Sequence, residues 1–274
     1  MRISVMTTLR PGPQSRDRTL DQIVGYARRV EERGFPGIWV TDSLGRGRPT
    51  LDPLSVLAAL SVATRRVELG TSVLQVPLRH PVELARCAQT VQALSGGRLR
   101  LGVGSGSTKA DFDLLDADFG ERFRTLMHSL EIMRRAWKGD PVKGGVLSPW
   151  PGCEGGPPIV LGAWRNRRWI TYAATECYGW TASGHYSSWE DLERGMRIYR
   201  EAGGGNAILA NVAIDLAERP ETGNLGEVAQ VSLIGPSDEV RRRLKRIEQI
   251  GFDEILAVSP AAALDDIERV RDFL

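Results

Sequence analysis

The chain has 274 residues, of which 42% are hydrophobic and 26% are charged. This is enough apolar material for one large domain with a full core, so we predict a single domain over residues 1–274. The formal net charge is only +2, which excludes a broad electrostatic field for nucleic acid or an anionic membrane. Cys87, Cys153 and Cys177 lie far apart, and this spacing predicts neither a disulfide framework nor a metal site.

The chain shows no signal-peptide pattern and no long apolar run. A secretory signal would place a charged segment before a short apolar one, and a membrane span would need about 20 apolar residues. We therefore expect a cytoplasmic protein without a membrane partner.

Short apolar strands alternate with amphipathic helices along the chain. The predicted strands cover residues 2–6, 37–41, 67–73, 99–104, 158–164, 177–183, 207–216 and 254–258. The predicted helices are 19–34, one opened by Asp52 and Pro53, one opened by Pro81, 121–139, a short one before 177, 188–204, 236–251 and 264–274. This alternation predicts an α/β protein with a (β/α)8 TIM barrel, which repeats the strand–helix unit eight times over about 250 residues. The rival is a doubly wound sheet, but "TTLRPGP" follows the first strand and contains no GxGxxG.

In a barrel of this kind the chemistry lies at the C-terminal ends of the strands. The stretch "LGVGSGS" (101–107) has small residues that let backbone N–H groups approach a phosphate, although an ordinary turn has the same composition. In "LGAWRNRR" (161–168) a helix begins beside three arginines. That arrangement suits a phosphate, and the alternative is a solvated basic helix start.

Three polar groups could take part in proton transfer or capping. Asp42 ends the second strand in "TDS", where a carboxylate acts either as a base or as the cap of the next turn. His185 lies in a strand-end loop, "TASGHYSSW", which is the best placement for proton transfer near neutral pH. His80 precedes Pro81 and is expected to cap a helix, whereas His128 lies within a helix and is expected to be structural.

The segment "VPLRHPVELARCAQTVQALSGGRLRLGVGSG" (76–106) resembles the bacterial luciferase-like monooxygenase family. The stretches 33–43 and 233–258 resemble the second strand and the last helix and strand of that family, so the likeness runs through nearly the whole chain in the expected order. The resemblance implies a (β/α)8 barrel that binds FMN or the deazaflavin coenzyme F420 at the strand C-termini.

The resemblance also implies the cofactor contacts. In the family the end of the third strand lies against the isoalloxazine ring, and a non-prolyl cis peptide is common there; by position it joins Ser72 and Val73. The loops after the fourth and fifth strands match places that hold the ribityl chain and phosphate. The predicted cofactor-binding residues are Thr71, Ser72, Val73, Gly104, Ser105, Gly106, Gly162, Ala163, Trp164 and Arg165, and no metal is expected.

One departure from the family concerns the catalytic groups. Many relatives have Asp-His where this chain has Asp42-Ser43, and a serine hydroxyl only donates and accepts hydrogen bonds. The proton transfer of that histidine is therefore not carried over to Ser43. We predict Asp42, Ser43 and His185 as the polar groups around the cofactor ring.

The predicted function is that of a flavin-dependent oxidoreductase or monooxygenase that uses reduced FMN on a small organic substrate. The cofactor would supply the difficult chemistry and the protein the positioning. One alternative is an F420-dependent oxidoreductase that transfers a hydride, and a second is a non-catalytic, flavin-binding or degenerate barrel. A homodimer and a separate flavin reductase are further expectations from the resemblance. The substrate is not predicted, because specificity in this fold lies in loops.

Overall fold

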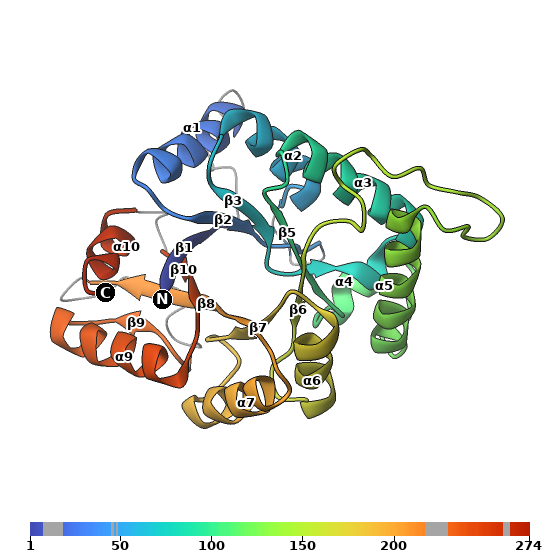
Figure 1. The fold of residues 1–274 in the computed structure, drawn as a ribbon. Coiled ribbons are helices and arrows are strands. Elements are labelled where there is room, and N and C mark those ends of the chain that lie inside the picture. Colours follow the sequence, from blue (N-terminus) through green and yellow to red (C-terminus); the bar gives the residue numbers. More distant parts are fainter. Residues whose placement is uncertain (8–18, 45–46, 48, 217–229, 260–263) are drawn as a thin grey trace. The chain divides into compact units, whose positions relative to one another are not determined.

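The computed structural model describes residues 1–7, 19–44, 47, 49–216, 230–259 and 264–274. Strands and helices alternate along the chain, as predicted (Figure 1). The strands are β1 Arg2–Thr7, β2 Gly37–Val40, β3 Glu68–Thr71, β4 Leu74–Gln75, β5 Leu99–Gly104, β6 Ile159–Gly162, β7 Gly179–Ser183, β8 Asn206–Asp215, β9 Leu233–Ile234 and β10 Glu254–Val258. The helices are α1 Thr19–Glu32, α2 Pro53–Ala63, the 3-10 turn η1 Val76–Leu78, α3 Pro81–Leu94, α4 Lys109–Asp113, α5 Arg122–Lys138, α6 Arg167–Glu176, α7 Trp189–Glu201, α9 Ser237–Ile250 and α10 Leu264–Arg271.

The strands belong to one sheet that closes on itself. Its hydrogen-bonded order is β10-β1-β2-β3-β5-β6-β7-β8, and β10 also pairs with β8. The short strands β4 and β9 are added beside β5 and β8. The pairs β1–β10, β8–β10, β3–β5, β6–β7 and β7–β8 are all parallel. The fold is therefore the predicted (β/α)8 barrel.

The chain divides into two compact units. One comprises Met1–Thr7, Gly34–Trp39 and Val160–Leu274, and the other Thr8–Arg33 and Val40–Ile159. In the first unit a buried apolar cluster joins side chains from five strands: Met6, Trp39, Val160, Ile208, Ala210 and Leu256. In the second unit α3 and α5 lie side by side (Figure 1). The indole Nε1 of Trp137 fixes this packing by donating to the carbonyl of Ala85 at 2.9 Å.

Two helices begin where the sequence predicts. Asp52 is the N-cap of α2 and its side chain accepts from the backbone N–H of Ser55 at 2.8 Å, with Pro53 as the first helical residue. Pro81 likewise opens α3. His80 occupies the N-cap position of α3, where the sequence places it, but its side chain makes no capping hydrogen bond.

The segment "LSGGR" has a structural role at the end of α3. The Arg98 guanidinium donates to the carbonyls of Ser95 at 2.7 Å, Val67 at 2.8 Å and Ser61 at 2.9 Å. It therefore joins the end of α3 to the end of α2 and to the residue before β3. These bonds satisfy carbonyls that helix ends leave without an intrahelical partner.

Glu31 makes a similar connection near the end of α1. Its carboxylate accepts from the backbone N–H groups of Arg65, Arg66 and Val67, at 2.9, 2.6 and 3.1 Å. Burial by itself would raise the pKa of Glu31, but the three N–H groups outweigh it and lower the pKa. A carboxyl group with a lowered folded-state pKa adds stability above its unfolded-state pKa and loses it as the pH falls through the folded-state value.

We expect Glu31→Gln to lower the free energy of unfolding by about 1 kcal/mol at pH 7, a value reduced for solvent exposure. The gap between the two proteins should narrow below about pH 4, where the wild-type carboxylate takes up its proton. Urea unfolding at pH 7 and pH 3.5 measures both values. Glu32→Gln, at an exposed neighbouring position, is the control. A gap that stays constant with pH would contradict this role of Glu31.

Candidate functional site

The third strand is interrupted where the cofactor ring was expected. β3 ends at Thr71, and the Ser72–Val73 peptide bond is cis, which confirms the prediction for this bond. β4 then resumes the pairing with β5, but its register has shifted by one residue, so this edge contains a bulge. The Thr71 hydroxyl donates to the carbonyl of Gly102 at 2.6 Å and fixes the strand end on β5.

Two glycines of "LGVGSGS" make room for the chain's own side chains. A Cβ at Gly104 would lie 2.6 Å from Cγ2 of Val73. At Gly106, where φ is +79°, it would lie 2.7 Å from the Phe112 ring and 2.8 Å from Oε1 of Gln75. The contacts that require glycine here are internal, which supports the turn interpretation that the sequence left open beside the phosphate loop.

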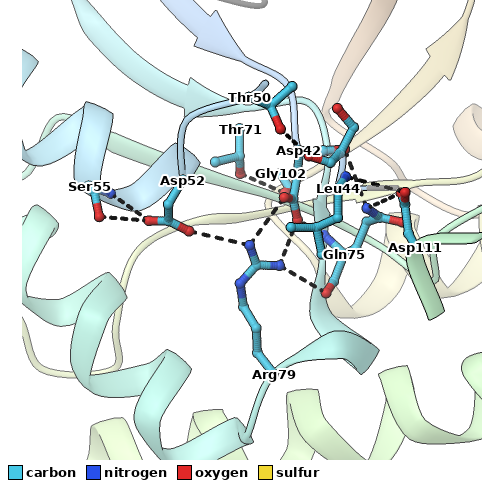
Figure 2. A network of polar contacts seen from close by, with 11 residues as sticks. Asp42, Leu44, Thr50, Asp52, Ser55, Thr71, Gln75, Arg79, Gly102 and Asp111 are labelled. Carbon is cyan, nitrogen blue, oxygen red and sulfur yellow. Dashed lines mark hydrogen bonds and ion pairs between the residues drawn. The ribbon is translucent and has the colours of Figure 1, made fainter. Parts of the chain in front are cut away.

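Asp42 is the centre of a polar network at the ends of β2 and β4 (Figure 2). Its Oδ2 accepts from the backbone N–H of Gln75 at 2.8 Å and from Arg79 Nη1 at 2.6 Å, and its Oδ1 accepts from Arg79 Nη2 at 3.1 Å. Arg79 Nη1 also donates to the Gln75 carbonyl at 3.2 Å. The Asp42 side chain is only 2% exposed, so both of its oxygens are used by this forked contact.

Arg79 also approaches the helix cap of α2. Its Nη2 lies 3.4 Å from Oδ2 of Asp52, which Figure 2 shows on the other side of the guanidinium. Burial by itself would lower the pKa of Arg79, but the hydrogen bond and charge of Asp42, followed by Asp52, outweigh it and raise the pKa. The guanidinium therefore stays charged, and it links the ends of β2 and β4 to the start of α2.

A second carboxylate fixes the other side of this edge. Asp111, fully buried on α4, accepts from Gln75 Nε2 at 2.8 Å and from the backbone N–H of Leu44 at 3.2 Å (Figure 2). Ser43 thus lies between two residues whose positions are fixed, and its own carbonyl accepts from the Thr50 hydroxyl. The result is a half-buried serine on a rigid strand end.

Three residues of this network were not predicted as site residues. Gln75 is a polar residue within an apolar strand, and Arg79 belongs to "RHP". Both residues stand out in the sequence, but the sequence does not show which partner each of them binds. Asp111 gave none, because α4 has five residues and is too short to show helical periodicity.

The other predicted site residues lie at the ends of β6 and β7, in the first unit. Gly162 pairs with Thr181, whose carbonyl accepts from the N–H of Ala163 at 3.1 Å. Arg165 donates to the Tyr186 carbonyl at 2.8 Å and pairs with Asp191 at 2.8 Å. The loop also holds aromatic contacts: the Trp164 ring stacks on the Tyr186 ring with centroids 4.4 Å apart, and the His185 ring meets Tyr186 edge-on at 4.5 Å.

Burial favours the neutral form of His185. It lowers the pKa of the imidazole from the usual value of histidine. Its Nδ1 is buried and has no hydrogen-bond partner among the described residues. A neutral imidazole can accept a proton or share one in a hydrogen bond, as the predicted catalytic role requires.

The start of α6 has the chemistry that a phosphate needs. Asn166 caps the helix, and Arg167 and Arg168 occupy its first turn, both exposed. Free N–H groups, the helix dipole and arginine together favour an anion. A phosphate group therefore fits the residues present at this end of α6.

The described part of the chain, residues 1–7, 19–44, 47, 49–216, 230–259 and 264–274, has neither a metal cluster nor a membrane-spanning helix. No group of three or more His, Cys, Asp and Glu residues there could hold a metal ion. None of the helices in the same ranges is long and apolar enough to cross a membrane.

The fold and these strand-end residues define a (β/α)8 barrel with polar and aromatic groups at the C-terminal ends of its strands. The chain belongs to the luciferase-like monooxygenase family, whose model matches residues 1–216. This confirms the family that the sequence resembles.

Individual relatives differ in their cofactor and reaction. An F420-dependent glucose-6-phosphate dehydrogenase of Amycolatopsis mediterranei is 35% identical over 44% of this chain and 38% of its own length. A 4-hydroxyprotoasukamycin monooxygenase of Streptomyces nodosus subsp. asukaensis is 34% identical over 40% of this chain and 30% of its length. Among solved structures, the monooxygenase RslO1 of Streptomyces bottropensis aligns over 100% of this chain and 97% of its own, with a TM-score of 0.83 and 19% identity. The matches thus cover well under half of the two curated relatives.

Proposed function

We propose that this protein is an oxidoreductase that holds reduced FMN at the strand ends and oxygenates a small organic substrate. The description of the family model and the 4-hydroxyprotoasukamycin monooxygenase support this reaction class. The observation that carries the proposal is that the two carboxylates at the edge formed by β2, β4 and β5 already accept hydrogen bonds. Asp42 is bound by Arg79 and Gln75, and Asp111 by Gln75 and Leu44.

This arrangement bears on the alternative reaction, hydride transfer to F420. Oxidising an alcohol in that way requires a base that takes the hydroxyl proton within hydrogen-bond reach. The two carboxylates of this edge are buried and already accept hydrogen bonds, and Ser43 replaces the histidine that the resemblance would supply. The relative that depends on F420 keeps this alternative open, and His185 is the residue that would serve as its base.

In the proposed reaction the residues of this chain position and shield the reacting groups. Reduced FMN, when bound, would supply the electrons for activating O2. Ser72, Val73 and Ser105 would serve as contacts of the ring and ribityl chain in the second unit. Arg165 and the start of α6 would serve as a phosphate site in the first unit. Asp42 and Arg79 hold the Gln75 backbone rigid, and the Ser43 hydroxyl would offer a hydrogen bond near the ring.

Two half-reactions test the proposal without knowledge of the substrate. In the first, the protein is mixed with F420 and glucose 6-phosphate, and the absorbance of oxidised F420 is recorded over time. We expect this absorbance to fall no faster than in the protein-free control. In the second, anaerobic protein with reduced FMN is mixed with O2, and we expect re-oxidation at a rate different from that of free reduced FMN. Reduction of F420, or re-oxidation identical to that of free FMN, would contradict the proposal.

A further inference from the structure

Two large aromatic side chains are exposed together at the ends of neighbouring strands. Trp164 follows β6 and Tyr186 follows β7, and the two rings stack with centroids 4.4 Å apart and planes 26° from parallel. In spite of this contact they remain 40% and 41% exposed. Exposed apolar surface that gathers at one place marks a binding site more often than single exposed residues do.

The loop that carries Tyr186 is held in one conformation. Arg165 donates to the Tyr186 carbonyl at 2.8 Å and is itself paired with Asp191, which completes the capping box of α7. At the start of the loop, the N–H of Gly184 donates to the Ala210 carbonyl at 2.8 Å. Because these bonds order the backbone of the loop before a ligand binds, less conformational freedom is lost on binding and more of the contact energy appears as affinity.

Two polar groups beside the aromatic pair have atoms without a hydrogen-bond partner among the described residues. His185 meets Tyr186 edge-on at 4.5 Å with an interplanar angle of 90°. His185 Nδ1 and the hydroxyl of the fully buried Ser187 have no hydrogen-bond partner among the described residues. Arg165 is held by an ion pair with Asp191, a carboxylate that also pairs with Arg194. Such a set favours a flat ring with a neutral hydrogen-bonding substituent.

We propose that Trp164 and Tyr186 form a stacking platform for a planar conjugated ring of the substrate, with His185 as the partner of a hydroxyl or carbonyl group on that ring. The inference rests on the proposed function in one respect, since it takes the ring to belong to the substrate of that oxidoreductase. The isoalloxazine ring has the same flat, conjugated chemistry, and the experiment separates the two sources.

Isothermal titration calorimetry with three probes tests the platform in the absence of any reductant. The probes are 2-naphthol, its saturated analogue decahydro-2-naphthol, and riboflavin. We expect 2-naphthol to bind more tightly than the saturated alcohol. Trp164→Ala and Tyr186→Ala should each weaken the binding of 2-naphthol by about 5- to 10-fold, the range of one aromatic contact. Trp164→Phe should retain most of the affinity. Trp150→Ala, at a tryptophan that is 59% exposed elsewhere on the surface, is the matched control and should change nothing.

Each other outcome overturns the proposal. Equal affinity for the flat and the saturated alcohol would remove the stacking role, and so would unchanged binding in both alanine variants. A loss of riboflavin affinity with unchanged 2-naphthol affinity would assign the platform to the cofactor ring and overturn the substrate assignment. Because 2-naphthol binding is measured without FMN, the titration tests the stacking platform even if the proposed oxygenation does not occur.

Discussion

Asp42→Ala is expected to lower the free energy of unfolding by about 3 kcal/mol. The change leaves the Arg79 guanidinium without its main partner, although the Arg79 side chain is only 20% exposed. The backbone N–H of Gln75 also loses its acceptor, since it donates to Oδ2 of Asp42 at 2.8 Å. The end of β4 then loses its fixed position, so FMN affinity should fall by at least about tenfold, which corresponds to about 1.4 kcal/mol. Urea unfolding and an FMN titration measure the two effects.

A double-mutant cycle separates the ion pair from the loss of either residue. In Asp42→Ala/Arg79→Met no buried charge is left unpaired, because Asp52, the other partner of Arg79, is half exposed. We therefore expect the double variant to be more stable than the sum of the single variants predicts. Glu83→Ala is the matched control, since Glu83 and Arg86 form an ion pair that is largely exposed on α3; removing it should cost well under about 1 kcal/mol. Additive effects of Asp42 and Arg79 would show that the pair is not coupled.

The second large effect is expected at Gly104. The added methyl group of Gly104→Ala would lie 2.6 Å from Cγ2 of Val73, so the strand end must shift, at a cost of about 1–3 kcal/mol. Because Val73 belongs to the edge predicted to face the cofactor ring, FMN affinity should fall as well. Thermal unfolding and the same FMN titration provide the readouts.

Val73→Ala removes the methyl group that the new side chain would meet. Gly104→Ala/Val73→Ala should therefore recover most of the stability and affinity lost in Gly104→Ala. Gly205→Ala is the control, because a Cβ at that glycine meets nothing within 4 Å. If the double variant is no better than Gly104→Ala, the close approach of Val73 is not the reason for glycine at this position.

The regular part of the fold was readable from the sequence. Apolar periodicity predicted the alternation of strands and helices, and the Asp52-Pro53 and Pro81 signals placed two helix starts correctly. These features are local, because a window of ten to twenty residues is long enough to show the period of a helix or strand and its flanking signals. The short elements β4, β9 and α4 were missed, because two to five residues show no period.

The candidate site was readable only in part. The cis Ser72–Val73 bond was predicted from the family resemblance and is confirmed. The pairing of Asp42 with Arg79, 37 residues further along the chain, was not predicted, since "RHP" looked like a helix start. Long-range pairs of this kind depend on which strand ends meet, and a single sequence does not state that. Tyr186 and Asp191 were missed for the same reason. The roles predicted for Asp42, Ser43 and His185 remain predictions.

The central claim, that these strand ends hold a flavin, is tested most directly by parallel fluorescence titrations of the apoprotein with FMN and with F420. The account predicts saturable FMN binding that Asp42→Ala weakens by at least about tenfold, and weaker binding of F420. Tight binding of F420 with no binding of FMN would contradict the proposed cofactor, and binding of neither would contradict the claim that the site is intact.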